Sequence, residues 1–134
     1  MKTILFATLL LTVASSSAVV AEHTKDPLAK VKDRLKKGKA VLIDVREKRE
    51  WDRGHLKQAR LVPLSKLREY KGRKQATKPL QKDKIIYCHC RSGVRVLQAA
   101  DILKKIGYDV RPLKHGYRDL LKAGFPKAKR SSSK

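Results

Sequence analysis

The chain contains few aromatic and few acidic residues. Phe, Trp and Tyr together make up 5% of the 134 residues, and Asp and Glu supply 12 charges against 34 from Lys and Arg. Proteins that bind single-stranded nucleic acid usually stack bases on aromatic side chains. The scarcity of aromatics therefore disfavours nucleic acid as the main ligand. The net charge of +22 still attracts anions, or simply gives a well-solvated surface.

Cysteine is also scarce. Cys88 and Cys90 are the only two, and no group of Cys and His residues has the spacing of a zinc site. We therefore expect no bound metal. The sequence contains no internal repeat, and a chain of 134 residues allows one domain.

The first 21 residues have the pattern of a secretory signal peptide. Lys2 is followed by an apolar segment over residues 4–13 and then by small residues up to Ala21. This segment is too short to span a bilayer comfortably, so a retained anchor is the less favoured alternative. We expect cleavage after Ala21, a periplasmic location, no stable membrane anchor, and a mature charge of +21, because Lys2 is the only charge in the leader.

An apolar run ends in a cysteine and is followed by a helical pattern. Residues 85–87 favour a strand, Cys90 ends it, and apolar residues recur at helical spacing from about Val94 to Ile106. Only four residues separate Cys90 from Arg95. In such a loop the backbone N–H groups turn inward, and the first turn of the helix adds unpaired donors. We expect an anion to bind there and the thiol to ionise more readily than that of a free cysteine.

Cys90 is therefore the candidate nucleophile of an anion-binding loop. Its candidate binding residues are Arg91, Ser92, Gly93, Val94 and Arg95. The plainer alternative is that Cys90 is a small buried apolar residue, because cysteine is among the most commonly buried residue types. The strand–Cys–Gly–Arg–helix order favours the nucleophile.

Two motifs resemble the rhodanese (thiosulfate sulfurtransferase) superfamily. Cys90-Arg91-Ser92-Gly93-Val94-Arg95 resembles the active-site loop of that family. Residues 42–59 resemble its amino-terminal pattern of Asp-Val-Arg, then Glu with an aromatic residue, then Gly-His-aliphatic and Ala. The likeness covers about residues 40–118 and is greatest to small single-domain periplasmic rhodaneses of the phage-shock type. Cysteine phosphatases place one more residue between Cys and Arg, so sulfur transfer is favoured over phosphate hydrolysis.

The resemblance implies a fold and an activity. The alternation of strand and helix patterns indicates an α/β protein, and the resemblance implies three α/β/α layers around a mainly parallel five-stranded sheet. It implies transfer of a sulfane sulfur from thiosulfate or a related small anion through a Cys90 persulfide to a thiol, or to cyanide in an assay. No metal or organic cofactor is implied, and we expect a monomer. A non-catalytic persulfide carrier and a polyanion-binding module on the same scaffold are the alternatives.

The resemblance also assigns roles to individual residues. The loop amides from Arg91 to Arg95 stabilise the persulfide and the departing anion, and Arg91 and Arg95 attract the donor. Asp44, Arg46 and His55 support the site structurally. The domain is expected to cover residues 22–124, with a frayed basic tail over residues 125–134.

The role of Cys88 is left open between two alternatives. Because residues two apart on a strand point to the same face, Cys88 and Cys90 lie close together. A Cys-X-Cys disulfide would be strained and easily reduced, so Cys88 is a candidate redox partner of Cys90. The favoured alternative is that Cys88 fills the core beneath the loop.

The remaining elements are predicted from caps and patterns. Asp26 caps a first helix that Gly38 ends, and Gly54 closes a short helical segment. Residues 71–83 read as a loop. The other expected elements are strands over residues 40–45, 61–63 and 108–113, a helix capped by Ser65, and a helix over residues 117–123.

Overall fold

The apolar runs predicted as strands form one parallel sheet in the computed structural model, which describes residues 20–130. The sheet has the strand order β2-β1-β3-β4, and every neighbouring pair is parallel. The strands are β1 (Ala40–Asp44), β2 (Ala59–Leu61), β3 (Ile85–His89) and β4 (Asp109–Pro112). The register of β1 and β3 places Asp44 beside His89, so the carboxyl ends of the two central strands lie together.

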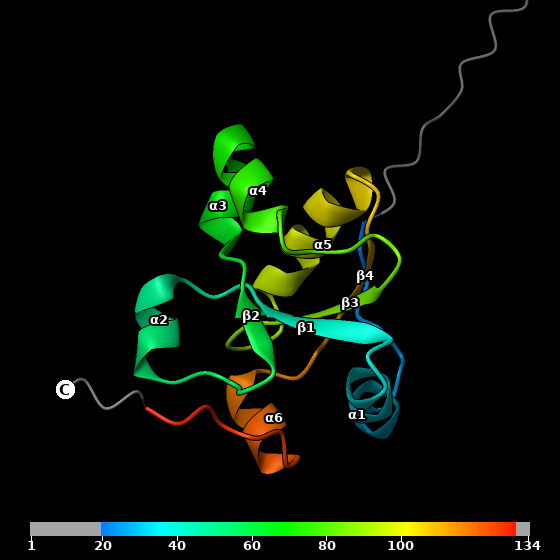
Figure 1. Cartoon of the computed structure of the whole chain (residues 1–134), viewed down its shortest axis with the longest axis vertical. Coiled ribbons are helices and arrows are strands. Elements are labelled where there is room, and N and C mark those ends of the chain that lie inside the picture. Colours follow the sequence, from blue (N-terminus) through cyan, green and yellow to red (C-terminus); the bar gives the residue numbers. More distant parts are fainter. Residues whose placement is uncertain (1–19, 131–134) are drawn as a thin grey trace, which may run out of the picture.

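Helices cover both faces of the sheet (Figure 1). They are α1 (Leu28–Lys36), α2 (Lys48–Arg53), α3 (Leu64–Arg68), α4 (Tyr70–Thr77), α5 (Arg95–Lys105) and α6 (Tyr117–Lys122). In Figure 1, α3, α4 and α5 lie on one side of the sheet, and α1 and α6 lie on the other. The predicted three-layer α/β fold is confirmed.

Two apolar clusters hold the layers together. Alternate residues of β1 enter opposite clusters, with Ile43 on the α5 side and Leu42 on the α1 side. This is the pattern of a parallel strand buried on both faces. The first cluster includes Val96, Ala100 and Leu103 of α5 together with Leu67 of α3. The second includes Val31 of α1 and Leu120 of α6.

The sheet has four strands in the described part of the chain, where the resemblance implied five. The segment before α1 does pass beside the edge strand β4. It makes one backbone hydrogen bond there, from the Thr24 N–H to the Pro112 carbonyl at 2.8 Å. Pro112 has no N–H to donate in return, so a ladder cannot continue through that residue.

The prediction of a loop over residues 71–83 is wrong for its first half, which belongs to α4. This helix is held by local hydrogen bonds and by packing against α3. Arg73 Nε donates to the Leu67 carbonyl at 2.7 Å, and Thr77 Oγ1 donates to the Arg73 carbonyl at 2.8 Å. The sequence of α4 is mainly polar, and it therefore lacks the apolar stripe by which a helix is recognised.

Two expected helix caps have other roles. Pro27 occupies the cap position of α1, and Asp26 instead accepts hydrogen bonds from Tyr87 Oη at 2.7 Å, Arg34 Nη1 at 2.7 Å and Arg111 Nη1 at 3.0 Å. The Tyr87 hydrogen bond, together with the two guanidinium groups, holds the pKa of Asp26 well below its usual range. Pro63 occupies the cap position of α3, and Ser65 lies within that helix.

The chain after residue 124 is packed, in contrast to the frayed tail that we expected there. Phe125 is 3% exposed and belongs to the core cluster under α1 and α6. Lys127 forms an isolated antiparallel bridge with Leu56, and the Ala128 N–H donates to the His55 carbonyl at 2.9 Å. The domain boundary expected at residue 124 is therefore too early, because residues 125–130 belong to the fold; residues 131–134 lie outside the described residues.

The expected leader falls almost wholly on residues 1–19, which lie outside the described residues. Ala21 is described, and it is 4% exposed within the core cluster on the α5 side. Its backbone N–H donates to Asp101 Oδ1 at 2.8 Å. Cleavage after Ala21 would remove these contacts. In residues 20–130, no helix has the length and apolar character needed to cross a bilayer.

We predict that Phe125→Ala lowers the free energy of unfolding by about 3 kcal/mol, because it removes a buried aromatic ring from the second core cluster. Urea denaturation followed by circular dichroism measures the change. Lys129→Ala, an exposed substitution in the same segment, is the control and should change stability by less than about 0.5 kcal/mol. Equal effects of the two substitutions would show that the segment is not anchored by Phe125.

Candidate active site

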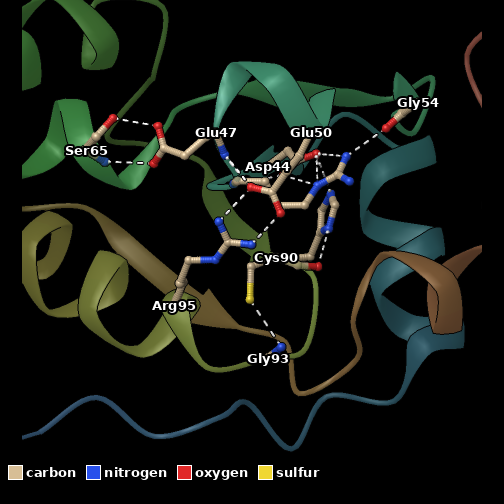
Figure 2. Close-up of polar contacts among 10 residues, drawn as sticks. Asp44, Glu47, Glu50, Gly54, Ser65, Cys90, Gly93 and Arg95 are labelled. Carbon is tan, nitrogen blue, oxygen red and sulfur yellow. Dashed lines mark hydrogen bonds and ion pairs between the residues drawn. The ribbon is translucent and has the colours of Figure 1, made fainter. Parts of the chain in front are cut away.

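The loop from Cys90 to Val94 connects the end of β3 to the start of α5. Gly93 has a φ of 83°, and a Cβ there would overlap the carbonyl oxygen of Lys114. Both facts favour glycine at this position. In this conformation the Gly93 N–H donates to Cys90 Sγ at 3.1 Å (Figure 2). The loop therefore turns at least one of its expected amides toward the sulfur.

Cys90 is 0% exposed in this structure. It belongs to the core cluster on the α5 side, together with Cys88 and Val96. A small anion in solvent cannot touch Sγ in this arrangement. Any reaction at the sulfur therefore requires the side chains or the backbone around it to open.

Arg95 does not extend freely toward solvent. Its guanidinium forms a two-pronged ion pair with Glu50 of α2, with Nη1 at 2.7 Å from Oε2 and Nη2 at 2.8 Å from Oε1. Figure 2 shows this pair beside Cys90, and the charge of a Cys90 thiolate is one of the causes that raise the pKa of Arg95, after the Glu50 bond. Arg95 thus ties the start of α5 to α2.

Glu50 is part of a capping box at the start of α2. Its Oε2 also accepts from the Glu47 N–H at 2.9 Å. The Glu47 carboxylate in turn accepts from Ser65 Oγ at 2.7 Å. The Arg95 bond, helped by the Glu47 N–H, lowers the pKa of Glu50 to about 2 in spite of the cost of burial.

The other loop residues differ in exposure. Arg91, Ser92 and Val94 are exposed, whereas Gly93 is buried. The loop is held from the α6 side, where the Tyr117 N–H donates to the Cys90 carbonyl at 2.9 Å. Gly116 lies so close that a Cβ there would overlap the Arg91 carbonyl. The backbone of residues 116–117 therefore fixes the outer side of the loop.

A histidine from the far end of the chain also contacts the loop. His23 Nε2 lies 2.6 Å from the Gly93 carbonyl oxygen, to which it donates. Because a peptide group is planar and trans, this bond also orients the Val94 N–H in the opposite direction, away from His23. His23 and Gly93 are 70 positions apart, and no pattern in the sequence connects them.

Asp44 and Arg46 form a buried ion pair beside the site. Arg46 Nη2 lies 2.7 Å from Asp44 Oδ2 and also donates to the Gly54 carbonyl at 2.9 Å. The Arg46 guanidinium lies 4.3 Å from the centre of the Tyr117 ring. These contacts join the end of β1 to the end of α2 and the start of α6, which is the kind of support that the resemblance implied.

His89 completes the buried polar group at the ends of the central strands. It is 0% exposed, and its Nε2 lies 3.6 Å from Asp44 Oδ2 without forming a hydrogen bond. Burial lowers the pKa of His89, although the Asp44 charge acts in the opposite direction. The neutral form of the imidazole is therefore favoured at neutral pH.

His55 lies outside the Cys90 loop. Its ring stacks on Trp51 with centroids 3.6 Å apart, and Nδ1 lies 3.0 Å from the Trp51 carbonyl oxygen, to which it donates. Across residues 20–130, no three His, Cys, Asp or Glu side chains gather as a metal site. His55 is placed where it closes the end of α2.

Cys88 lies in the core, and both cysteines are free. Its Sγ is 3.8 Å from the Val96 carbonyl oxygen. Burial raises the pKa of the Cys88 thiol far above its usual value, and the nearby Cys90 charge adds to the effect. The neutral thiol is a poor nucleophile, so the structure favours the core-filling role over the redox role.

A hollow of about 260 Å³ opens beside the loop. Its lining comes from the connection between β1 and α2, from α2 and the glycine after it, from the Cys90 loop and from α6. The lining residues are Arg46, Glu50, Arg53, Gly54, Arg91, Tyr117 and Arg118. Of these, Arg46 and Arg91 were predicted from the sequence as site residues. Arg53 and Arg118 were missed because single arginines on two short helices carry no pattern that links them.

Comparison with known proteins identifies the family. The rhodanese-like domain matches residues 27–123, which include both motifs, the whole sheet and the Cys90 loop. The chain belongs to the rhodanese-like domain family. Its fold and its loop are thus those of a family that includes sulfurtransferases.

Individual relatives of this rhodanese-like domain agree with the family assignment. The Bacillus subtilis protein YqhL is 41% identical over 81 residues, which are 60% of each chain. The human single-domain sulfurtransferase TSTD1 has a TM-score of 0.59 and 28% identity, with 71% of this chain and 92% of that chain covered. A rhodanese from E. coli with anions has a TM-score of 0.53 and 28% identity, covering 67% and 98%. The rhodanese-like domain spans less than two thirds of the length of the curated relatives it matches.

We predict that Glu50→Gln lowers the free energy of unfolding by about 1 kcal/mol at pH 7, because the ion pair with Arg95 is partly exposed. The folded-state pKa of Glu50 is depressed, so its stabilisation is present above pH 4.5 and is lost as pH falls toward about 2. Urea denaturation at several pH values should show that the difference in free energy of unfolding between wild type and Glu50→Gln becomes smaller in acid. A difference that does not change with pH would contradict the ion-pair assignment. Lys48→Gln, which breaks an exposed pair on the same helix, is the control.

We predict that His23→Ala speeds hydrogen exchange of the Gly93 and Val94 amides about fivefold, because one hydrogen bond to the loop is lost. Nuclear magnetic resonance measures both rates. His23→Gln retains a side-chain N–H and should restore part of the protection, and the Ile43 amide in β1 serves as the internal reference. Unchanged exchange in His23→Ala would show that the histidine does not hold the loop.

Proposed function

We propose that this rhodanese-like domain is a sulfurtransferase that carries a sulfane sulfur as a persulfide on Cys90. The observation that supports this most directly is the Gly93 N–H on Cys90 Sγ, in a loop between a central strand and the first turn of α5. A donor aimed at the sulfur stabilises negative charge there. The same group remains in place when the sulfur is extended by one atom.

The first half of the reaction loads the sulfur. The Cys90 thiolate attacks the outer sulfur of thiosulfate, a new S–S bond forms, and the S–S bond of thiosulfate breaks with sulfite as the leaving group. The electron pair of the broken bond leaves with sulfite, so no external oxidant is needed. Arg91, exposed next to Cys90, attracts the anionic donor. Arg95 acts through its pair with Glu50, which sets the start of α5.

The second half returns the enzyme to its resting form. A thiolate acceptor attacks the outer sulfur of the Cys90 persulfide, and Cys90 leaves as a thiolate. The product is the persulfide of the acceptor, and cyanide takes the sulfur in the same way in an assay. Catalysis of this kind gives double-displacement kinetics. The proposal needs no metal or organic cofactor, and it includes a monomeric domain that works after export to the periplasm.

A persulfide carrier with slow turnover is the second candidate, and the burial of Cys90 favours it. If the site opens for thiosulfate but, once loaded, reopens only when a partner binds, the domain loads one sulfur and releases it mainly to that partner. Single-turnover loading and steady-state turnover therefore distinguish the two. A carrier loads fully and turns over slowly, whereas an enzyme does both at comparable rates.

We predict that thiosulfate adds one sulfur atom to the wild-type protein and to Cys88→Ala, and none to Cys90→Ser, because only Cys90 has an amide donor on its sulfur among the described cysteines. Intact-protein mass spectrometry measures the addition. Circular dichroism checks that both variants are folded. A sulfur retained in Cys90→Ser would assign the nucleophile to Cys88 and overturn the mechanism.

A further inference from the structure

The 260 Å³ hollow beside the Cys90 loop carries more positive charge than its own acids neutralise. Two of its charged residues already have a partner of opposite charge, since Arg46 pairs with Asp44, and Glu50 pairs with Arg95. The remaining cations are Arg53, Arg91 and Arg118, all exposed. Within residues 20–130, no hydrogen bond or ion pair engages these three guanidinium groups. The hollow therefore presents three uncompensated cations to a ligand.

These cations are placed by the same backbone that fixes the loop. Arg91 directly follows Cys90, and Arg118 follows Tyr117, whose N–H donates to the Cys90 carbonyl. Arg53 ends α2 next to Gly54, the carbonyl of which accepts from Arg46. The three arginines thus come from three segments that meet at the Cys90 loop, so a ligand bound in the hollow lies beside the loop that carries the reacting cysteine.

One residue that lines the hollow, Tyr117, has a polar group without a partner. Tyr117 Oη is buried and makes no hydrogen bond to the described residues. It lies next to Gly54, where a Cβ would come within 2.9 Å of it. A buried hydroxyl without a partner is costly. A ligand oxygen can accept its proton once the side chains around the hydroxyl move apart.

We propose, on the basis of the function proposed above, that the sulfur acceptor is a small thiol with two carboxylate groups, bound by Arg53, Arg91 and Arg118. Guanidinium forks bind carboxylates in two-pronged geometry. A compact dianion such as thiosulfate needs only the loop and one neighbouring cation, whereas three cations on three different segments suit charges that are spread along a ligand. The volume is small for a ligand site, so a dicarboxylate thiol fits and a nucleotide-sized one does not.

The bound acceptor completes the transfer without another reactant. Its thiolate attacks the outer sulfur of the Cys90 persulfide, the acceptor–sulfur bond forms, and the Cys90–sulfur bond breaks with its electron pair returning to Cys90. The arginines hold the carboxylates and take no part in the bond changes. They are specificity-determining residues that raise the local concentration of acidic thiols.

A binding experiment tests the hollow without any sulfur chemistry. Succinate is titrated into the full chain at low salt, with the arginine Nε–H resonances followed by nuclear magnetic resonance. We expect Kd to rise about tenfold in Arg53→Gln/Arg118→Gln, and by less than twofold in Lys122→Gln/Lys129→Gln. The control removes the same total charge from exposed positions on α6 and the carboxyl-terminal segment, outside this hollow.

A kinetic experiment tests specificity. The protein is loaded with thiosulfate, and its loss of sulfur to mercaptosuccinate is compared with its loss to 2-mercaptoethanol. We expect the ratio of the two kcat/KM values to fall about tenfold in Arg53→Gln/Arg118→Gln and to stay within twofold in the control. The wild-type ratio should also fall as salt rises, because exposed charges are screened.

The two experiments separate the two proposals. Arginine-dependent succinate binding with no sulfur loaded on Cys90 would overturn the sulfurtransferase function and keep the hollow as an acid-binding site. Normal loading with an unchanged kcat/KM ratio in the arginine variant would overturn the acidic acceptor and leave the sulfurtransferase function standing. Equal effects of the arginine variant and its control would overturn the acidic acceptor, because the preference for acidic thiols would then depend only on the total charge of the protein.

Discussion

The buried Asp44–Arg46 pair is the interaction on which the site depends. Its two charges lie at the end of β1, and Arg46 reaches both the Gly54 carbonyl and the ring of Tyr117. Tyr117 in turn donates its N–H to the Cys90 carbonyl. The Arg46 guanidinium thus connects the central sheet to α2 and α6, and through Tyr117 to the Cys90 loop. Breaking such a pair leaves an uncompensated buried charge, which typically costs about 3–5 kcal/mol.

Parts of the molecule that are determined by residues close together in the sequence could be predicted. The strand, loop and helix around Cys90 are continuous in the chain, and their apolar spacing and Gly93 defined them. The pairing of Glu50 with Arg95 and of His23 with Gly93 joins distant residues, and no local pattern indicates it. Two local predictions were also wrong. The helix α4 was predicted as a loop because it is polar and is stabilised by its contacts with α3, and Phe125 was placed in a frayed tail because it is a single aromatic in a basic segment.

The strong positive charge has different consequences in different places. Around α1, Asp26 gathers Arg34 and Arg111 on one carboxylate, so scarce acids there serve several cations. Beside the Cys90 loop the acids are already committed, Asp44 to Arg46 and Glu50 to Arg95. In a chain with few acidic residues, basic side chains therefore stay unpaired wherever the nearby carboxylates already have partners. The vicinity of the candidate nucleophile is one of those places.

The closed position of Cys90 has a consequence for survival under oxidative stress. Peroxides convert exposed thiolates stepwise to sulfenic, sulfinic and sulfonic acids, and the last two steps are in general irreversible. Sγ is enclosed between the sheet and α5, with the Gly93 amide on it and no surface open to solvent. The resting protein is therefore shielded from irreversible damage, and the sulfur becomes vulnerable only during the brief opening that its chemistry requires.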